Sequence, residues 1–340
     1  MESQTFRALR IEETADKEHT RKIAARKIDD LPKNEVLVRV HYSSLNYKDA
    51  LSAIGNRGVT RRYPHTPGID AAGFVEHSED PEFKPGMPVI VSCYDLGMNT
   101  SGGFGEYIRV PGSWVMPCPD GLTLKQSMIF GTAGFTAGLS VQRLLDHGVR
   151  ADQGRVLVTG GTGGVGSMAI AILALENFKI TAVSGKPEQH DFLTAHGAER
   201  IISREQATDT KNRTLLKGQW AGVIDTVGGP VLETAVKSTR YGGAVTCCGN
   251  VASPELHLTV YPFILRGVSL LGIDAAQCAM ELRKRIWKKL AGPWKIDRLE
   301  DMARTISLEQ LDEAIEQMLQ GRNKGRVVLE HRTAAGKSAG

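Results

Sequence analysis

The clearest chemistry in the sequence belongs to a glycine-rich segment. It contains G-x-G-x-x-G at Gly161, Gly163 and Gly166 and reads Thr159-Gly160-Gly161-Thr162-Gly163-Gly164-Val165-Gly166. An apolar run that is typical of a buried strand precedes it, and an apolar stretch that is typical of a helix follows. Glycines allow a backbone to approach a pyrophosphate closely, and the N–H groups that begin a helix attract phosphate. We therefore expect a dinucleotide-binding loop, with a glycine-rich turn of an unrelated α/β protein as the alternative.

The residues after the next expected strand bear on the choice of dinucleotide. An NAD site has Asp or Glu about 20 residues after the glycines, where it binds the ribose 2′-hydroxyl. This chain has Ser184-Gly185-Lys186 there. A hydroxyl and an ammonium bind a 2′-phosphate, which a carboxylate would repel, and Arg204 can add a bidentate contact. The pattern predicts NADPH; the alternative is that Lys186 and Arg204 are solvated surface charges.

Other catalytic patterns find no support in the sequence. No C-x-x-C occurs, and His65 and His77 have no partner pattern, so we expect no metal site. No G-x-S-x-G nucleophile segment occurs, which removes the support for hydrolysis by acyl transfer. The five scattered cysteines favour a reducing cytoplasm; they are Cys93, Cys118, Cys247, Cys248 and Cys278.

Composition limits the partners of the chain. The 340 residues, 41% hydrophobic and 24% charged, suit a folded protein of two domains or one large α/β unit. A net charge of +4 gives no reason to expect nucleic acid, and no apolar stretch is long enough for a membrane helix. The first residues, MESQTFRALRIEE, have no apolar region, so we expect no secretory signal. The basic run from Arg283 to Lys289 predicts an amphipathic helix, whose basic face is either simply solvated or attracts a phosphorylated substrate such as a coenzyme A ester.

The positions of the expected elements divide the chain. Residues 1–124 are rich in glycine, proline and short β patterns, as at 36–40 and 89–91, which favours a small β domain. A helix is expected from about Leu124 to Gly148, and alternating strands and helices then predict a doubly wound parallel sheet over 125–300. Six strands are expected, at 156–159, 179–183, 201–202, 222–225, 244–248 and 268–273. We expect residues 301–332 to return to the first domain and 333–340 to be disordered.

Several segments occur together in an order that resembles a known family. They are Ser43 to Asp49 (SSLNYKD), Pro67 to Asp70 (PGID), Gly131 to Ala137 (GTAGFTA), the glycine loop, Ser184 to Lys186 and Pro262 to Arg266 (PFILR). The set resembles the zinc-free quinone oxidoreductase branch of the medium-chain dehydrogenase/reductase superfamily, and most of all its acrylyl-CoA reductases. The resemblance runs from about Phe6 to Leu329. It implies a GroES-like catalytic domain, a Rossmann domain and a cytoplasmic homodimer that pairs through the strand near 268–273.

The resemblance also implies roles for individual residues. Tyr47 should lie near the nicotinamide, and Val165, Gly166 and Ser167 at the pyrophosphate. Ser184, Gly185, Lys186 and Arg204 should hold the 2′-phosphate, and Gly249, Asn250 and Arg326 should lie beside the cofactor. Relatives often have Arg where this chain has Lys186, and Gly-Ala-Ser or Gly-Ala-Thr where it has Gly160-Gly161-Thr162. The first departure keeps the charge but loses the fork of the guanidinium, which softens the expected selectivity.

The implied reaction is NADPH-dependent reduction of a C=C bond, from acrylyl-CoA to propanoyl-CoA, by an oxidoreductase that acts on CH–CH bonds. Asn46 and Tyr47 are the candidates for positioning and donation, with Asp49 and Asp70 as orienting groups. A purely structural hydrogen-bond network is the alternative, for Asp49 above all. Two other functions stay open: reduction of quinones or enones, and NADPH binding without catalysis.

Overall fold

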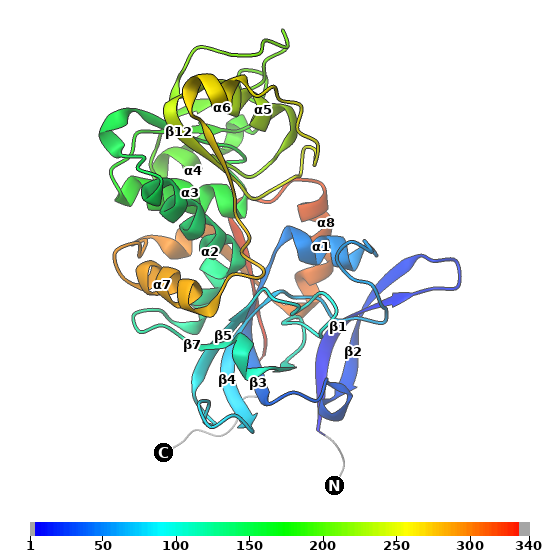
Figure 1. Cartoon of the computed structure of the whole chain (residues 1–340). Helices are drawn as coiled ribbons and strands as arrows, with labels where there is room; N and C mark the ends of the chain where they lie inside the picture. The colour runs from blue at the N-terminus through cyan, green and yellow to red at the C-terminus, as the bar shows by residue number, and fades with distance from the viewer. Residues whose placement is uncertain (1–3, 333–340) are drawn as a thin grey trace. The chain divides into compact units, whose positions relative to one another are not determined.

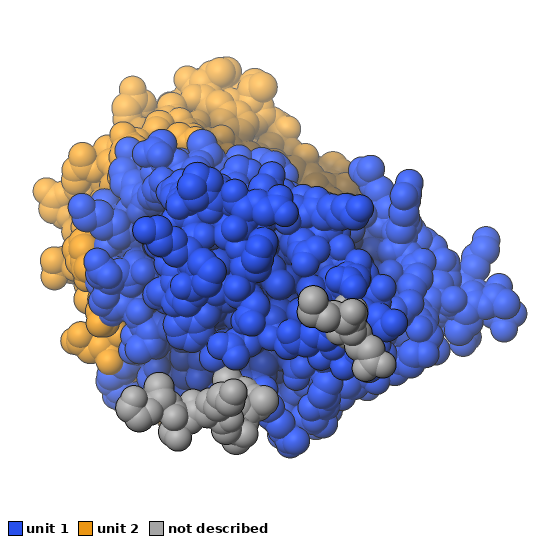
Figure 2. Space-filling model, turned by 90° about the horizontal axis from the view of Figure 1, so that it is seen from below, with its two compact units in different colours: residues 1–132, 276–291, 298–340 blue, residues 133–275, 292–297 orange. Residues whose placement is uncertain are grey.

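The computed structural model describes residues 4–332, shown in Figure 1. The expected disordered tail at 333–340 lies outside these residues. The chain divides into two compact units, which Figure 2 colours separately. Unit 1 consists of residues 1–132, 276–291 and 298–340, and unit 2 of residues 133–275 and 292–297. Each unit contains its own sheet and apolar core.

Unit 2 is built on a six-stranded sheet in which every neighbouring pair is parallel. Its strands are β8 (Arg155–Val158), β9 (Ile180–Val183), β10 (Ala198–Ile202), β11 (Trp220–Asp225), β12 (Thr239–Cys247) and β13 (Ser269–Gly272). The spatial order β10-β9-β8-β11-β12-β13 is the order of two mononucleotide-binding halves placed side by side. Leu157, Val223 and Val245 in the middle strands are buried, as expected for strands covered on both faces. The prediction of a doubly wound parallel sheet is confirmed.

Helices alternate with these strands, with one exception that matters below. They are α3 (Gly164–Leu175), α4 (His190–Ala195), α5 (Gly229–Lys237) and α6 (Tyr261–Arg266). The connection from β10 to β11, residues 203–219, has turns and bends but neither helix nor strand. One face of the sheet beside β10 and β11 is therefore covered by an irregular segment.

Unit 1 holds a seven-stranded sheet of order β14-β15-β3-β4-β5-β7, with β6 also paired to β3, and a separate hairpin of β1 and β2. The strands are β1 (Thr5–Glu13), β2 (His19–Lys27), β3 (Val36–Leu45), β4 (Asp70–Ser78), β5 (Pro88–Ser92), β6 (Tyr107–Val110), β7 (Val115–Pro117), β14 (Ala303–Ile306) and β15 (Arg326–Glu330). The helices are α1 (Tyr47–Ala53), α7 (Met280–Ala291) and α8 (Leu311–Leu319). The C-terminal segment returns to this sheet, because β15 pairs antiparallel with β3 and places Val328 opposite Ser44.

The structure departs from the expected helix at 124–148 in its middle. Helix α2 (Leu124–Asp146) is broken at Gly131, whose φ of 49° and ψ of −156° are not helical. The division between the units falls one residue later, after Thr132, rather than at 124. Segment 276–291, expected in the dinucleotide domain, belongs to unit 1 by its contacts. An apolar window in the sequence predicts a helix well but does not reveal one backbone angle inside it.

Helix α7 confirms an amphipathic helix at the basic run, but not a basic face that includes Arg283. Only 2% of Arg283 is exposed. Its Nη1 donates to the carbonyl and hydroxyl oxygens of Ser92, at 3.2 and 3.1 Å, and its guanidinium lies 4.5 Å from the centre of the Tyr94 ring. These contacts replace the water that the charge loses on burial. Arg283 thus attaches α7 to the end of β5, while Lys284, Arg285 and Lys288 are exposed.

Candidate cofactor and substrate site

The glycine loop follows β8 and leads into α3 through a backbone that other residues would distort. Gly160 has a φ of +60°, in the left-handed region that favours glycine. A Cβ on Gly166 would lie 2.3 Å from the carbonyl oxygen of Gly160. A Cβ on Gly161 would press on Ala182 of β9 at 3.2 Å. The loop is therefore closely packed against both the first turn of α3 and the neighbouring strand.

The N-terminus of α3 presents free donors beside this loop. Gly163 is the N-cap, and the N–H of Ser167 donates to its carbonyl oxygen at 3.0 Å. The N–H groups of Gly164, Val165 and Gly166 have no acceptor among the described residues, as at any helix start without a capping side chain. Together with the helix dipole, these groups form an anion-binding site that suits a pyrophosphate.

A buried polar group fixes the carboxyl ends of the two neighbouring strands. The hydroxyl of Thr159 donates to Asp225 Oδ1 at 2.7 Å, and the N–H of Gly228 donates to Asp225 Oδ2 at 2.8 Å. Burial raises the pKa of Asp225, whereas the hydrogen bonds from these donors lower it. Gly249, after β12, approaches the same turn so closely that a Cβ would lie 2.0 Å from the carbonyl oxygen of Thr226. Because β8, β11 and β12 are adjacent, the loop, Asp225 and Gly249 meet at one edge of the sheet.

Two cations lie near each other where β9 and β10 end. The Ser184 hydroxyl accepts a hydrogen bond from the N–H of Lys186 at 3.1 Å. Burial lowers the pKa of Lys186, and the positive charge of Arg204 lowers it further, while Glu188 acts in the opposite direction. A Cβ on Gly185 would lie 3.0 Å from Arg204 Nε, so the guanidinium lies against this turn. The structure thus brings Ser184, Gly185, Lys186 and Arg204 together.

A second polar group in unit 1 is centred on the carboxylate of Asp70, which is fully buried. It accepts from Ser44 Oγ at 2.5 Å, from Asn46 Nδ2 at 2.8 Å, and from the backbone N–H and hydroxyl of Thr132 at 2.9 and 2.7 Å. Arg326 Nη2 lies 3.9 Å from Asp70 Oδ2. We call these five residues, Ser44, Asn46, Asp70, Thr132 and Arg326, the Asp70 cluster.

The break in α2 makes room for this cluster. A Cβ on Gly131 would lie 2.6 Å from Ser44 Oγ, 2.7 Å from Asp70 Oδ2 and 2.9 Å from Arg326 Nη2. The left-handed φ at Gly131 also turns the next N–H, that of Thr132, onto the carboxylate. The glycine is therefore required twice, for its backbone angle and for the space beside it.

Arg326 neutralises the buried carboxylate and ties three segments together. Its guanidinium donates to the carbonyl oxygen of Ile129, to Asn46 Oδ1 and to Ser44 Oγ, at 3.0, 3.2 and 2.8 Å. Burial lowers its pKa, which the negative charges of Asp70 and Asp49 oppose. An arginine remains charged under such conditions, so the cluster holds a paired charge rather than a lone one.

Asn46 and Asp49 set the start of α1. The amide of Asn46 is engaged inside the cluster, and its backbone N–H donates to Asp49 Oδ2 at 2.8 Å. Asp49 Oδ1 accepts from the N–H groups of Gly68 and Ile69 at 3.1 and 2.8 Å. Burial nevertheless raises the pKa of Asp49 to about 7. Asp49 thus joins α1 to the segment before β4 and has no access to solvent.

Tyr47 differs from its neighbours because 38% of it is exposed. It is the first residue of α1, and its hydroxyl has no hydrogen-bond partner among the described residues. Of the four residues expected to take part in catalysis, Tyr47 alone is exposed, and the other three, Asn46, Asp49 and Asp70, are buried.

The structure brings many of the expected residues close together and adds others that the sequence did not indicate. Unit 2 gathers the expected residues of the loop with Ser167, Ser184, Lys186, Arg204 and Gly249, and Asn250 lies exposed in the same unit. Unit 1 holds Arg326 with Asn46 and Asp70. Ser44, Thr132, Thr159 and Asp225 were missed as site residues. For two of them, Ser44 and Thr132, the sequence offered one indication: they lie in the segments SSLNYKD and GTAGFTA, which carry the family resemblance.

Two features are absent from residues 4–332, the part of the chain that the structure describes. In this part of the chain, no three His, Cys, Asp or Glu side chains lie close enough together to hold a metal ion. None of the helices described has the length and apolar character that crossing a membrane requires.

The fold and the loop define a nucleotide-dependent oxidoreductase of two domains, and comparison with known proteins agrees. The model of the alcohol dehydrogenase GroES-like domain matches residues 32–120, and that of the zinc-binding dehydrogenases matches residues 164–291. The putative quinone oxidoreductase YhfP of Bacillus subtilis is 44% identical over 96% of this chain and 99% of its own length. The acrylyl-CoA reductase AcuI of Ruegeria pomeroyi is 43% identical over 89% of this chain and 92% of its own.

Solved structures give the same result. The yhdH oxidoreductase of Salmonella enterica, in complex with NADP, has a TM-score of 0.93 at 39% identity and covers 96% of this chain and 100% of its own. B. subtilis yhfP with NAD bound also has a TM-score of 0.93, at 43% identity, with coverage of 96% and 100%. The chain therefore belongs to the medium-chain dehydrogenase/reductase superfamily, in the branch of these quinone oxidoreductases and acrylyl-CoA reductases. The family, the GroES-like and Rossmann folds and the enzyme class are confirmed.

Proposed function

We propose that this enzyme uses NADPH to reduce the C=C bond of an α,β-unsaturated acyl-CoA, with acrylyl-CoA as substrate and propanoyl-CoA as product. The choice of cofactor rests on two cations. Lys186 follows β9, at the position where an NAD site would have an acid, and Arg204 follows β10 and lies close to it. The solved relative from S. enterica is described with NADP, and two relatives at 41–43% identity are named as acrylyl-CoA reductases.

The residues present fit the proposed cofactor. The free N–H groups at the start of α3 suit the pyrophosphate, and the glycines of the loop leave a cradle that a Cβ would fill. Ser184, Lys186 and Arg204 supply a hydroxyl and two cations for a 2′-phosphate. Asn250, after β12, is available to the remainder of the dinucleotide at the same sheet edge.

Bound NADPH would supply the hydride, which adds to the β-carbon of the unsaturated thioester. The chain must then hold the carbonyl oxygen, on which negative charge develops, and bring one proton to the α-carbon. We assign the proton to Tyr47, because this residue is exposed and its hydroxyl has no hydrogen-bond partner among the described residues. Asn46 is a positioning residue, because its amide already donates to Asp70 and to the carbonyl oxygen of Ser44.

A thioester of coenzyme A also carries phosphates, for which helix α7 offers a partner. Lys284, Arg285 and Lys288 are exposed on one helix that Arg283 fixes to the end of β5. The same region connects to the Asp70 cluster, because Cys93, one residue after β5, has its sulfur 3.1 Å from Thr132 Oγ1. These cations favour an acyl-CoA over an uncharged acceptor.

The direct test follows NADPH oxidation at 340 nm with acrylyl-CoA, then with a quinone, then without acceptor. We expect turnover with acrylyl-CoA well above that with the quinone. Turnover with the quinone alone would establish the second function, to which the name of the B. subtilis relative points. NADPH binding without turnover of either acceptor would show a binding protein.

The role of Tyr47 has its own test. Tyr47→Phe keeps the ring and removes the hydroxyl, so kcat with acrylyl-CoA should fall by about 10²-fold, the lower end of the effect of a general acid. NADPH affinity should not change, since the hydroxyl would act only on the acyl group. An unaltered kcat would remove Tyr47 as the proton donor.

Two features support the expected assembly and location. Strand β13 forms the edge of the parallel sheet, and Val260, Tyr261, Ile264 and Leu265 on and beside α6 are exposed and apolar. We propose that a homodimer forms through this edge, which light scattering on the purified protein tests; the mass of one chain would contradict it. The free state of all five cysteines suits the reducing cytoplasm, which we propose as its location.

A further inference from the structure

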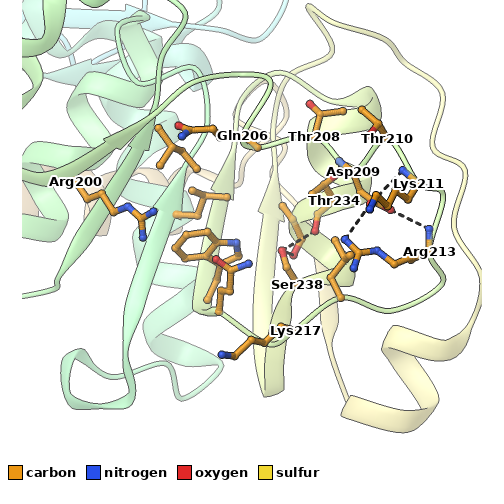
Figure 3. A pocket seen from close by; sticks show the side chains of 17 residues that line it. Arg200, Gln206, Thr208, Asp209, Thr210, Lys211, Arg213, Lys217, Thr234 and Ser238 are labelled. Atoms are coloured by element: carbon orange, nitrogen blue, oxygen red, sulfur yellow. Dashed lines mark hydrogen bonds and ion pairs between the residues drawn. The ribbon is translucent and has the colours of Figure 1, made fainter.

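A hollow on the sheet of unit 2 has the composition of a ligand site (Figure 3). Its volume of about 350 Å³ lies in the lower part of the range for small-molecule sites. The hollow exists because the connection from β10 to β11 forms no helix, so segment 203–219 covers the sheet only in part. Its floor is apolar and belongs to the core of the unit; it consists of Leu157, Ile202, Ala207, Trp220 and Ala235.

Cations surround this apolar floor. Arg200, Lys211, Arg213 and Lys217 all line the hollow, and all four are exposed. Asp209 is the one acid of the lining, and only 3% of its side chain is exposed. It accepts from the backbone N–H of Arg213 at 2.9 Å and pairs with that guanidinium at 3.3 Å.

The remaining three cations keep their charge available. The side chains of Arg200, Lys211 and Lys217 form no hydrogen bond or ion pair with any residue of the described chain. Thr208, Thr210 and Gln206 add polar groups to the same rim, as Figure 3 shows. The hollow therefore offers unneutralised positive charge above a floor of apolar core residues that are almost fully buried.

The hollow is separate from the dinucleotide loop. Trp220 is the first residue of β11, and Ser238 directly follows the last residue of α5. The glycine loop follows the last residue of β8, and Gly229 at the start of α5 lies at that same end of the sheet. Trp220 and Ser238 therefore lie at the amino ends of β11 and β12, whereas Ile202, Gln206 and Ala207 of the same hollow lie at or after the carboxyl end of β10; no residue of the glycine loop lines it.

We propose that this hollow binds a small anionic amphiphile, a molecule with a carboxylate or phosphate on an apolar body. The body packs on Trp220 and its apolar neighbours, and the anion lies at the cationic rim, where Figure 3 places Arg200 on one side and Lys211 on the opposite side, with Lys217 below. The cations attract negative charge and supply most of the affinity, and the apolar floor of core residues accepts a short apolar body. An acidic peptide satisfies the cations but not the enclosed apolar floor.

The probe for this site is 8-anilinonaphthalene-1-sulfonate, an aromatic anion whose fluorescence rises in an apolar site. The titration uses the full chain with saturating NADP⁺ to keep the probe from the dinucleotide loop. Octanoate and octyl phosphate should displace the probe, and their relative strength identifies the preferred anion. Octanol, which has the apolar body without the charge, should displace it at least tenfold less well.

Variants locate the binding. Lys211→Glu with Lys217→Glu should raise the Kd of the probe at least tenfold, whereas Lys179→Glu, an exposed lysine of the same unit outside the hollow, should leave it unchanged. Ala207→Phe places a large side chain on the floor of the hollow and should remove binding of the probe. Circular dichroism verifies that this variant folds. If it does not fold, the test rests on the charge variants.

Three results would overturn the proposal. One is equal probe affinity in the wild type and in the Lys211/Lys217 variant. Another is equal displacement by octanol and octanoate. The third is stronger displacement by hexaglutamate than by octanoate, which would assign the surface to an acidic peptide. None of these results depends on the enzyme's substrate, so the proposed function can fail or succeed independently.

Discussion

The glycine loop of unit 2 and the Asp70 cluster of unit 1 are built in opposite ways. The loop is one continuous segment that works mainly through backbone N–H groups and through the absence of side chains. The cluster joins side chains from β3, β4, α2 and β15, and it works through a buried charge pair. A local backbone site tolerates change around it, whereas a dispersed buried network depends on every member.

Loss of the arginine should therefore be the most damaging single change. Arg326→Met leaves Asp70 buried without its counter-charge, and we expect the free energy of unfolding to fall by about 3–5 kcal/mol. Urea denaturation measures this, with Arg322→Met, an exposed arginine four residues away, as the control. A loss below about 1 kcal/mol would show that the other donors to Asp70 are sufficient.

Asp49 should make the stability of unit 1 depend on pH. Its pKa is raised from 3.8 to about 7, so the folded chain holds the proton more tightly than the unfolded chain. Its contribution is fully present below about pH 3.8 and is lost as pH rises through about 7. Between pH 5 and 8 the free energy of unfolding of the wild type should therefore fall by about 2–3 kcal/mol relative to that of Asp49→Asn. If the difference in the free energy of unfolding between the two proteins stays the same from pH 5 to 8, Asp49 is ionised in the folded chain throughout this range.

A change in the loop should affect binding more than folding. In Gly166→Ala the new Cβ collides with the carbonyl oxygen of Gly160, so the loop must shift away from α3. We expect the Kd for NADPH to rise about 10–100-fold, equivalent to about 1.4–2.7 kcal/mol. Gly272→Ala is the matched control, because a Cβ there meets nothing within 4 Å. Calorimetry measures both, and equal affinities would show that the loop adapts.

The smallest effect should be on the choice between cofactors. Lys186→Ala removes one of two cations near the proposed 2′-phosphate site, which should reduce the preference for NADPH over NADH about tenfold. NADH affinity should stay the same, since NADH has no 2′-phosphate. Lys179→Ala is the control. A loss of affinity for both cofactors alike would place Lys186 elsewhere than at the 2′-phosphate.

The two regions also differ in how far the sequence predicts them. The glycine spacing, the flanking strand and helix and the missing acid all lie between Val156 and Arg204, where local patterns are reliable. The alternation of strands that follows them predicted the parallel sheet. The break at Gly131, the burial of Arg283 and the missing helix at 203–219 were not predictable, because each depends on what packs against that segment.

By itself the sequence determined the type of sheet and the position of the glycine loop between a strand and a helix, since these follow from residues near one another in the chain. Only the tertiary structure placed Ser44, Asp70, Thr132 and Arg326 around one carboxylate, across 282 residues of separation. It also engaged the side-chain amide of Asn46 with Asp70 and left Tyr47 exposed. A buried charge needs partners on several sides at once, and only segments distant in the chain can surround it.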